Sequence, residues 1–435
     1  MTEQSIERAR LLLQVDRHED AARELTRVLA AEPENPEAHT LFALAAMGAK
    51  RFEEATDAAR RAVGLAPDWP HAHYVLGAVL CDRNREKEAL ASAREAVRLD
   101  PEDPDHHALE AACHAGTKRW KDMRAAAERA LELDPTHVWG LNLRAGALRQ
   151  LGELDAAAEA LDYALAEDPE DSNTHTSYGF AALQRGQVHD ALQHFREALR
   201  LEPENETARV GLAEALKARN PLYRPILWWM FWSSKLTGGS SLLVVFGLMF
   251  GMRALAKNMP ENGALSVVFL AVIALYVLAV WTSWVGSALF DFLLWLRRDT
   301  RDVLLPRDRT VAVCVGATVA AAPLAGALVG FTVGVPQGLL AAAAFLAVAI
   351  PVAGGLSLPN AKARFVGAAV ALVCVLLSVA GTLSLAFHGR AGDLPATEVG
   401  REQSGLGLGL LALALVAARL STWLLVFLGL VKERR

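Results

Sequence analysis

Proline recurs in the first half of the chain at a constant interval, with no insertion between one occurrence and the next. Proline has no backbone N–H to donate and disfavours a helical conformation in the residue before it, so each one ends a helix. It is tolerated in the first turn of the helix that follows. A period of about 34 residues is typical of a helix–turn–helix unit that stacks into a solenoid. The six positions are Pro33, Pro67, Pro101, Pro135, Pro169 and Pro203.

Small side chains keep the same period. Antiparallel helices approach closely only where the facing side chains are small. Three series of small residues precede the prolines, and the two that lie nearer to each proline consist almost entirely of alanine. The series that lies furthest ahead of each proline is Ala9, Ala43, Gly77, Ala111, Ala145 and Gly179.

This pattern resembles the tetratricopeptide repeat family over residues 2–219. The resemblance implies an all-α solenoid of six repeats, in which the first helix of each repeat lines a concave groove. We expect residues 206–219 to form one more first helix that caps the array. The chain departs from the family at a large aromatic position early in the first helix. Four histidines recur there, and we interpret them as packing residues and not as a metal site: His39, His73, His107 and His175.

The second half of the chain has a different composition. Residues 1–220 contain 27 basic and 40 acidic side chains, whereas residues 221–435 contain 17 basic and nine acidic ones. Long apolar stretches fill the second half, which predicts a bundle of about six membrane-spanning helices over residues 239–435. The predicted spans are 240–257, 264–285, 309–332, 337–355, 363–387 and 406–430. The basic segment between the second and third spans predicts a surface helix on one leaflet.

Residues 220–238 join the solenoid (1–219) to this bundle and hold a cluster of aromatic rings. Tryptophan and other amphipathic rings favour the headgroup level of a bilayer. We therefore predict a membrane-interface site, although a patch that packs the two halves together explains the same residues. The residues are Trp228, Trp229, Phe231 and Trp232.

Loop charges predict the orientation of the bundle. Arginine and lysine gather in the loops that would lie inside if the N-terminus were cytosolic, and the N-terminus has no apolar run of signal-peptide length. We expect a multi-pass protein of a bacterial plasma membrane with both termini in the cytosol. The whole arrangement, a repeat array followed by several predicted spans, resembles multi-span bacterial tetratricopeptide membrane proteins.

No catalytic motif, phosphate-binding loop or metal-ligand spacing is present in the sequence, so we expect no enzyme activity, no cofactor and no metal. The solenoid is acidic and therefore unsuited to nucleic acid. No carboxylate lies inside a predicted span, which disfavours a transporter driven by protons or sodium. Arg419 stands near the middle of the last span, where it is either an intramembrane polar site or a snorkelling side chain.

The function that these features favour is a membrane-tethered scaffold that binds a partner protein or peptide in the concave groove at the cytosolic face. Two alternatives stay open: a transporter or channel regulated by the repeats, and a membrane enzyme that acts on lipid. Transfer of the family register gives the groove residues, of which Tyr74, Trp139 and Phe180 equally well pack between repeats. They are Leu44, His71, Tyr74, Trp139, Asn142, Arg149, Asn173, Thr176 and Phe180.

Overall fold

The computed structural model describes residues 2–234, 264–300, 302–332, 335–357 and 361–388. Every regular element in these ranges is an α-helix. The chain divides into two compact units, Met1–Ala208 and Arg209–Arg435. The division falls inside a helix, ahead of the boundary predicted after residue 219.

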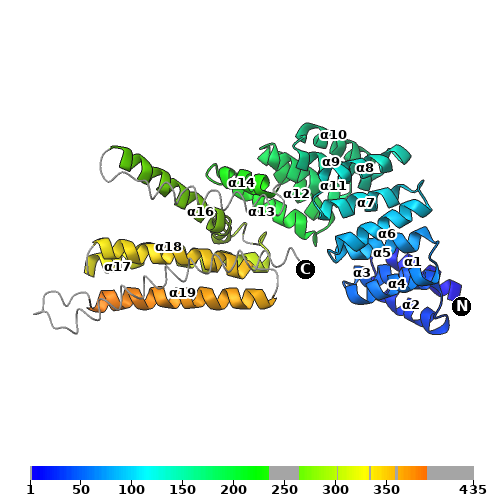
Figure 1. Ribbon diagram of the computed structural model, residues 1–435, viewed down its shortest axis with the longest axis horizontal. Coiled ribbons are helices and arrows are strands. Elements are labelled where there is room, and N and C mark those ends of the chain that lie inside the picture. The colour runs from blue at the N-terminus through cyan, green and yellow to red at the C-terminus, as the bar shows by residue number, and fades with distance from the viewer. Residues whose placement is uncertain (1, 235–263, 301, 333–334, 358–360, 389–435) are drawn as a thin grey trace, which may run out of the picture. The chain divides into compact units, whose positions relative to one another are not determined.

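The first unit is a stack of antiparallel helix pairs in chain order (Figure 1). Each pair holds a first helix of 13 or 14 residues and a second helix of 14 residues. The helices are α1 (Thr2–Gln14), α2 (His18–Ala31), α3 (Pro36–Gly48), α4 (Phe52–Leu65), α5 (Pro70–Asp82), α6 (Glu86–Leu99), α7 (Pro104–Gly116), α8 (Trp120–Leu133), α9 (Val138–Leu151), α10 (Leu154–Glu167), α11 (Ser172–Gln184) and α12 (Val188–Leu201). A seventh first helix, α13 (Glu206–Ala218), follows as expected.

The recurring proline lies in the turn between repeats, ahead of the first helical turn in which it would be tolerated. In three repeats a second proline begins the next helix: Pro36, Pro70 and Pro104. Asn35 caps α3 by accepting a hydrogen bond from the Ala38 N–H at 3.0 Å. Helix initiation is therefore shared between a proline at the first helical position and a polar N-cap.

A second series with the same period marks the turn inside each repeat. A residue between the first and second helix has a positive φ in all six repeats, a conformation that favours glycine. This series is not evident from residue type alone, because only two of its members are glycine. The members are Asp16, Lys50, Asn84, Lys118, Gly152 and Gly186.

The recurring histidines have a specific role within the turns. Each donates a hydrogen bond from Nε2 to the carbonyl of the recurring proline that precedes it. The Nε2–O distance is 2.8 Å for His39, 2.8 Å for His73, 2.9 Å for His107 and 3.1 Å for His175. This bond satisfies a carbonyl near the end of the preceding helix, where no helical N–H is available to it.

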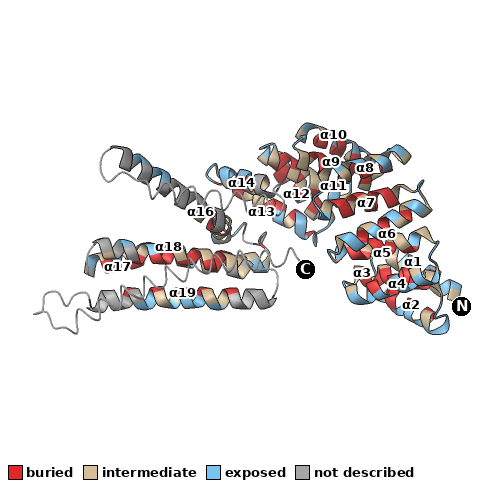
Figure 2. Cartoon of the chain, in the orientation of Figure 1, coloured by how far each residue is buried: buried red, intermediate tan, exposed pale blue. Residues whose placement is uncertain are grey.

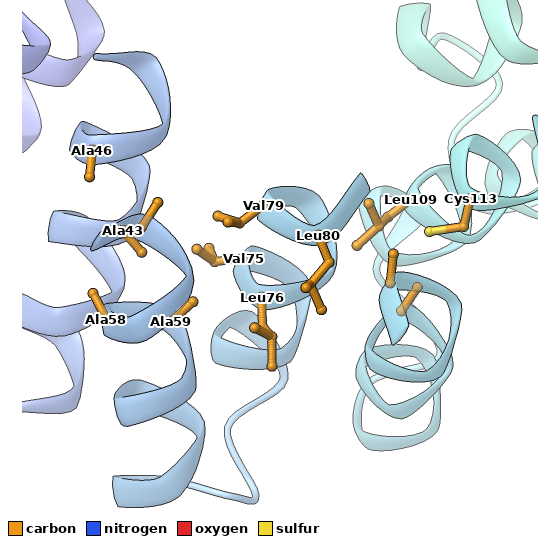
Figure 3. Packing of buried hydrophobic residues seen from close by; sticks show 13 residues of the cluster. Ala43, Ala46, Ala58, Ala59, Val75, Leu76, Val79, Leu80, Leu109 and Cys113 are labelled. Carbon is orange, nitrogen blue, oxygen red and sulfur yellow. The ribbon is translucent and has the colours of Figure 1, made fainter. Parts of the chain in front are cut away.

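The core of the first unit consists largely of the small residues that the period singled out. Figure 3 shows Ala43, Ala59 and Val75 where α3, α4 and α5 meet, with Leu80 reaching toward α7. Gly179 leaves room for the buried ring of Phe195, because a Cβ there would lie 2.6 Å from ring atom Cε1. These positions confirm that small residues set the spacing of the helices.

The second unit contains five further described helices: α14 (Arg224–Ser234), α16 (Ala264–Leu296), α17 (Pro306–Thr332), α18 (Val335–Ser357) and α19 (Ala361–His388). Helix α17 packs on α18, and α18 on α19, through alanine and valine. The Trp281 indole N–H of α16 donates to the carbonyl of Leu346 in α18 at 2.8 Å.

Four of the six predicted spans coincide with described helices, whereas 240–257 and 406–430 lie outside the described residues. By length and composition, one stretch among the described residues, Pro306–Phe331, is suited to cross a bilayer. The shorter apolar stretches are Val285–Leu296, Ala341–Gly354 and Gly367–Ala380. The six-span bundle therefore stays a prediction.

The segment predicted to form a surface helix after the second span is not a helix of its own. Residues 287–296 continue α16 without a break. No proline interrupts this stretch, and Gly286 lies inside the helix where a Cβ would meet the Ile226 side chain at 2.8 Å. Part of this segment packs against protein in the second unit, as Leu294 does against Ala213, and its location on a leaflet stays a prediction.

Candidate functional site

The predicted groove residues lie on the first helices α3, α5, α9 and α11, at the three- and four-residue spacings that place side chains on one face of a helix. Six of them are half-buried, His71 and Asn173 are exposed, and Thr176 is buried. Figure 2 shows red, buried stripes along these helices beside tan, half-buried positions. Half-burial is the degree of exposure that a contact face requires.

Aromatic rings group at α5 and α7. The rings of His71 and Tyr74 stack with centroids 5.7 Å apart, and Tyr74 lies 5.8 Å from the ring of His106 in the next repeat. Burial raises the pKa of Tyr74 to about 12, and the nearby carboxylate of Asp105 adds to the effect. Tyr74 therefore presents a neutral hydroxyl at neutral pH.

Trp139 begins the groove face of α9. It packs, half-buried, against the cluster formed by α3 to α7, and its ring centroid lies 6.5 Å from that of His137. His137 in turn contacts the Asp105 carboxylate at 3.1 Å, which lowers the pKa of that carboxyl. Trp139 thus contributes both to packing and to the half-exposed face.

The two asparagines of the groove set, Asn142 and Asn173, differ in their surroundings. Asn142 donates from Nδ2 to Asp171 Oδ2 at 3.1 Å and to Thr174 Oγ1 at 2.7 Å. Its Oδ1 is buried and has no hydrogen-bond partner among the described residues. Asn173 is exposed, so of the two amides only that of Asn173 is accessible to a ligand backbone in this structure.

Arg149 is the main cation of this face. Its guanidinium lies 6.0 Å from the centroid of the Phe180 ring, and Phe180 packs edge-on against Phe195 at 5.0 Å. Within the described ranges no carboxylate pairs with Arg149, and burial lowers the pKa of its guanidinium. A largely desolvated cation without an anion is a natural contact for a negatively charged group.

A second polar cluster, which the sequence analysis missed, lies in the second unit. Lys217 Nζ is 2.6 Å from Glu214 Oε1, 3.0 Å from Asp291 Oδ1 and 3.0 Å from Ser287 Oγ. The Tyr223 hydroxyl donates to Glu214 Oε2 at 2.7 Å. We call Glu214, Lys217, Tyr223, Ser287 and Asp291 the Lys217 cluster. Asp291 lies far from Lys217 in the chain, so sequence spacing alone did not indicate the pair.

The charges of the Lys217 cluster are unequal. One buried ammonium faces two carboxylates, and its side chain is only 2% exposed. The two carboxylates raise the pKa of Lys217 well above its ordinary value despite burial. Burial raises the pKa of Asp291 to about 6 against the opposing attraction of Lys217, and the nearby Glu214 carboxylate adds to the increase. The ammonium therefore keeps its proton, whereas burial favours the neutral form of Asp291.

The remaining predicted site residues are only partly described. Trp228 is exposed and Phe231 half-buried, which suits a contact with an apolar phase. The side chains of Trp229 and Trp232, and the whole of Arg419, lie outside the described residues.

One group of side chains in the described ranges has the spacing of metal ligands. Ligand atoms of Asp100, Asp103 and His106 lie within 4.8 Å of one another. However, Asp100 accepts from the Glu102 N–H and Asp103 from the Asp105 N–H, while His106 Nδ1 lies 3.0 Å from the Asp100 carbonyl. These bonds tie the group to the inter-repeat turn, and it is accounted for as a helix cap.

Comparison with known proteins identifies the repeats. Models of the tetratricopeptide repeat match residues 12–79 and 182–220, and a second such model matches residues 118–172. The N-terminal part of the chain belongs to the tetratricopeptide repeat family. No curated protein matches the sequence.

Several solved tetratricopeptide proteins are similar to this chain. A thermophilic TPR protein of Thermus thermophilus, TTC0263, is 20% identical, covers 42% of this chain and 99% of its own, and gives a TM-score of 0.40. PilF of Pseudomonas aeruginosa is 19% identical over 49% of this chain and 97% of its own, with a TM-score of 0.40. YrrB, a TPR protein with an unusual peptide-binding site, is 20% identical over 43% of this chain and 96% of its own, with a TM-score of 0.32.

Proposed function

We propose that this protein is a membrane-tethered scaffold that binds a partner protein or peptide on the first-helix face of its repeats. The observation that carries the proposal is the half-buried face of Tyr74, Trp139, Arg149 and Phe180. It combines large rings with a desolvated cation, and aromatic residues and arginine dominate binding hot spots. Tetratricopeptide arrays in general serve protein–protein interaction and not catalysis.

The tether rests on the second unit. Its helices α17 and α18 expose large apolar side chains such as Leu324, Phe331 and Leu339. Water disfavours such surfaces on a helix, whereas the hydrocarbon of a bilayer accepts them. The proposal includes the predicted six spans, the aromatic interface at Trp228 and a plasma-membrane location with both termini in the cytosol.

The binding face is tested by replacing its rings. In the variant Tyr74→Ala, Trp139→Ala, Phe180→Ala, we expect circular dichroism to keep its helical signal while partner recovery by in-cell photo-crosslinking falls. The matched control is Leu11→Ala, Leu65→Ala, Tyr163→Ala, which removes exposed apolar side chains that lie outside the groove set. Equal recovery from both triple variants would contradict the assignment of this face. Unfolding of the first variant alone would identify its rings as core residues.

The orientation is tested by labelling in intact cells. A cysteine at Gly392 should react with a membrane-impermeant maleimide, and a cysteine at Ala361 should not. Both positions follow from the distribution of basic residues among the predicted loops. The reverse labelling pattern would overturn the proposed orientation.

A further inference from the structure

Arg149 and Lys217 occupy the same position of the repeat. Arg149 follows Pro135 at the same separation at which Lys217 follows Pro203. Phe180 and Glu214 likewise share a position of the repeat, because Phe180 is as far from Pro169 as Glu214 is from Pro203. By repeat register, the face of α13 that carries Glu214 and Lys217 is therefore the equivalent of the groove face of α9 and α11.

On α13 this face is covered by the chain itself. Helix α16 brings Asp291 and Ser287 to Lys217, both at 3.0 Å. The Phe290 ring of α16 lies 4.8 Å from the ring of Tyr223, which is fully buried. Leu294 of α16 packs with Ala213 of α13. The occupant of the α13 face is thus an apolar helical segment with one acidic side chain aimed at the cation.

The sequence of this occupant defines its chemistry. Residues 286–296 read GSALFDFLLWL, in which Asp291 is the only charged side chain. Its carboxylate is brought into an apolar contact and needs the Lys217 ammonium, because an unpaired buried charge is strongly unfavourable. Aromatic and aliphatic neighbours supply the contact area around the pair.

Arg149 has the equivalent position and no such occupant among the described residues. Within that part of the chain its guanidinium contacts the Phe180 ring at 6.0 Å and has no carboxylate partner. The same helix, α9, also carries the half-buried Trp139 and Asn142. A cation beside an aromatic ring, with no anion of its own, is complementary to an acidic residue within an apolar segment.

We propose that the partner bound at α9 and α11 is an apolar helix with an internal aspartate or glutamate that pairs with Arg149, as Asp291 of α16 pairs with Lys217. This inference rests on the proposed function and specifies the chemistry of the partner. Phe180 and Trp139 contact the apolar side chains on either side of the carboxylate. Arg149 selects for the acidic residue.

A peptide with the sequence of residues 284–298 serves as the probe, fluorescently labelled and carrying a lysine tail for solubility. Its Asp291→Asn form is the matched peptide. Both are titrated by fluorescence anisotropy against the full chain in detergent, with empty micelles as the blank. The protein variants are Arg149→Met, Lys217→Met and, as the control, Arg61→Met, which removes an exposed arginine of α4.

We expect the wild-type protein to bind the aspartate peptide at least about tenfold more tightly than the asparagine peptide, because one of two paired charges is lost. Arg149→Met should abolish this difference. Arg61→Met and Lys217→Met should preserve the difference. A charge exchange, Arg149→Glu with an Asp291→Lys peptide, should restore tight binding.

Three results would overturn the inference. The first is equal binding of the two peptides to the wild-type protein, and the second is a difference that persists in Arg149→Met. The third is a difference that disappears only in Lys217→Met, which would mean that the peptide replaces α16 on α13. Absence of binding by either peptide would also reject an acidic apolar helix as the occupant. The triple ring variant tests separately whether this face binds a partner at all, so the proposed function can stand when the inference fails.

Discussion

The helices of the two units bury similar residues and expose different ones. Alanine and valine fill the contacts of α3, α4 and α5, and they equally fill the contacts of α17 and α18. On the outside, the solenoid carries charged pairs such as Arg98 with Glu95. In α17, by contrast, Leu324 is 72% and Phe331 87% exposed. Figure 2 shows the mixture of buried and exposed positions in both parts.

This comparison distinguishes the residues that pack helices together from the residues that face the surroundings of the protein. Small residues let helices approach closely in either unit, so the core alone does not reveal what surrounds the protein. The outward face does reveal it, because charged residues are hydrated at low cost and large apolar ones are not. The outward face of the first unit is therefore suited to water, and the large exposed side chains of α17 and α18 support the proposed membrane tether.

The Lys217 cluster is the exception within the second unit, and its disruption should give the largest effect. Lys217→Met leaves Glu214 and Asp291 as buried carboxylates without their cation. We expect a loss of about 3–5 kcal/mol in the opening free energy of α16, measured by hydrogen exchange at residues 286–296 in detergent. Lys121→Met, at an exposed lysine of α8, is the control. A change of less than about 0.5 kcal/mol in the Lys217 variant would mean that the cluster does not hold α16.

The same cluster should respond to pH in a defined direction. Burial raises the pKa of Asp291 from 3.8 to about 6 in the folded protein, against the opposing attraction of Lys217. The folded state therefore holds this proton more tightly than the unfolded state does. The resulting stability is complete below about pH 4 and is lost as pH rises through about 6.

The expected loss is of the order of 2–3 kcal/mol. The measurement is the free energy of unfolding of the wild-type protein minus that of Asp291→Asn across this pH range, so that the contributions of the other carboxylates cancel. The groups that face Asp291 are Lys217 and Glu214 of α13 and Asp308 of α17. A difference that is constant with pH would show that folding does not raise the pKa of Asp291.

A smaller effect should separate tight from open positions in the solenoid. Gly179→Ala forces a Cβ against the buried ring of Phe195, and overpacking of this kind destabilises by about 1–3 kcal/mol. Gly64→Ala meets no atom within 4 Å, so we expect no loss and a gain of up to about 0.5–1 kcal/mol in thermal unfolding. Equal changes in both variants would contradict the role of small residues in setting the helix spacing.

Much of the solenoid could be predicted from the sequence because its contacts are local and repeat. The proline period and the small series located helix pairs such as α3 with α4, and the seventh first helix α13. The positive-φ series was missed because lysine, which stands at positions 50 and 118, is not a residue type that indicates a turn. The histidine bonds were missed because their acceptors are backbone carbonyls, which leave no trace in residue type.

The candidate site was predictable only in part. Helical register placed Tyr74, Arg149 and Phe180 on one face, but the lack of a carboxylate near Arg149 within the described residues is a property of tertiary structure. The Lys217–Asp291 pair joins α13 to α16 and depends on how helices distant in sequence pack. The continuation of α16 beyond residue 285 was misjudged because charge patterning suggested a surface, whereas Asp291 is directed to a buried cation.

The contrast between the outward faces is tested most directly by spin labels at two exposed leucines. In a background without the four native cysteines, Leu11→Cys of α1 and Leu324→Cys of α17 are labelled and the protein is placed in liposomes. The leucines are 60% and 72% exposed, respectively. We expect the label at position 324 to be accessible to molecular oxygen and shielded from a water-soluble nickel complex, and the label at position 11 to show the opposite. Equal access of the nickel complex to both labels would contradict the membrane tether.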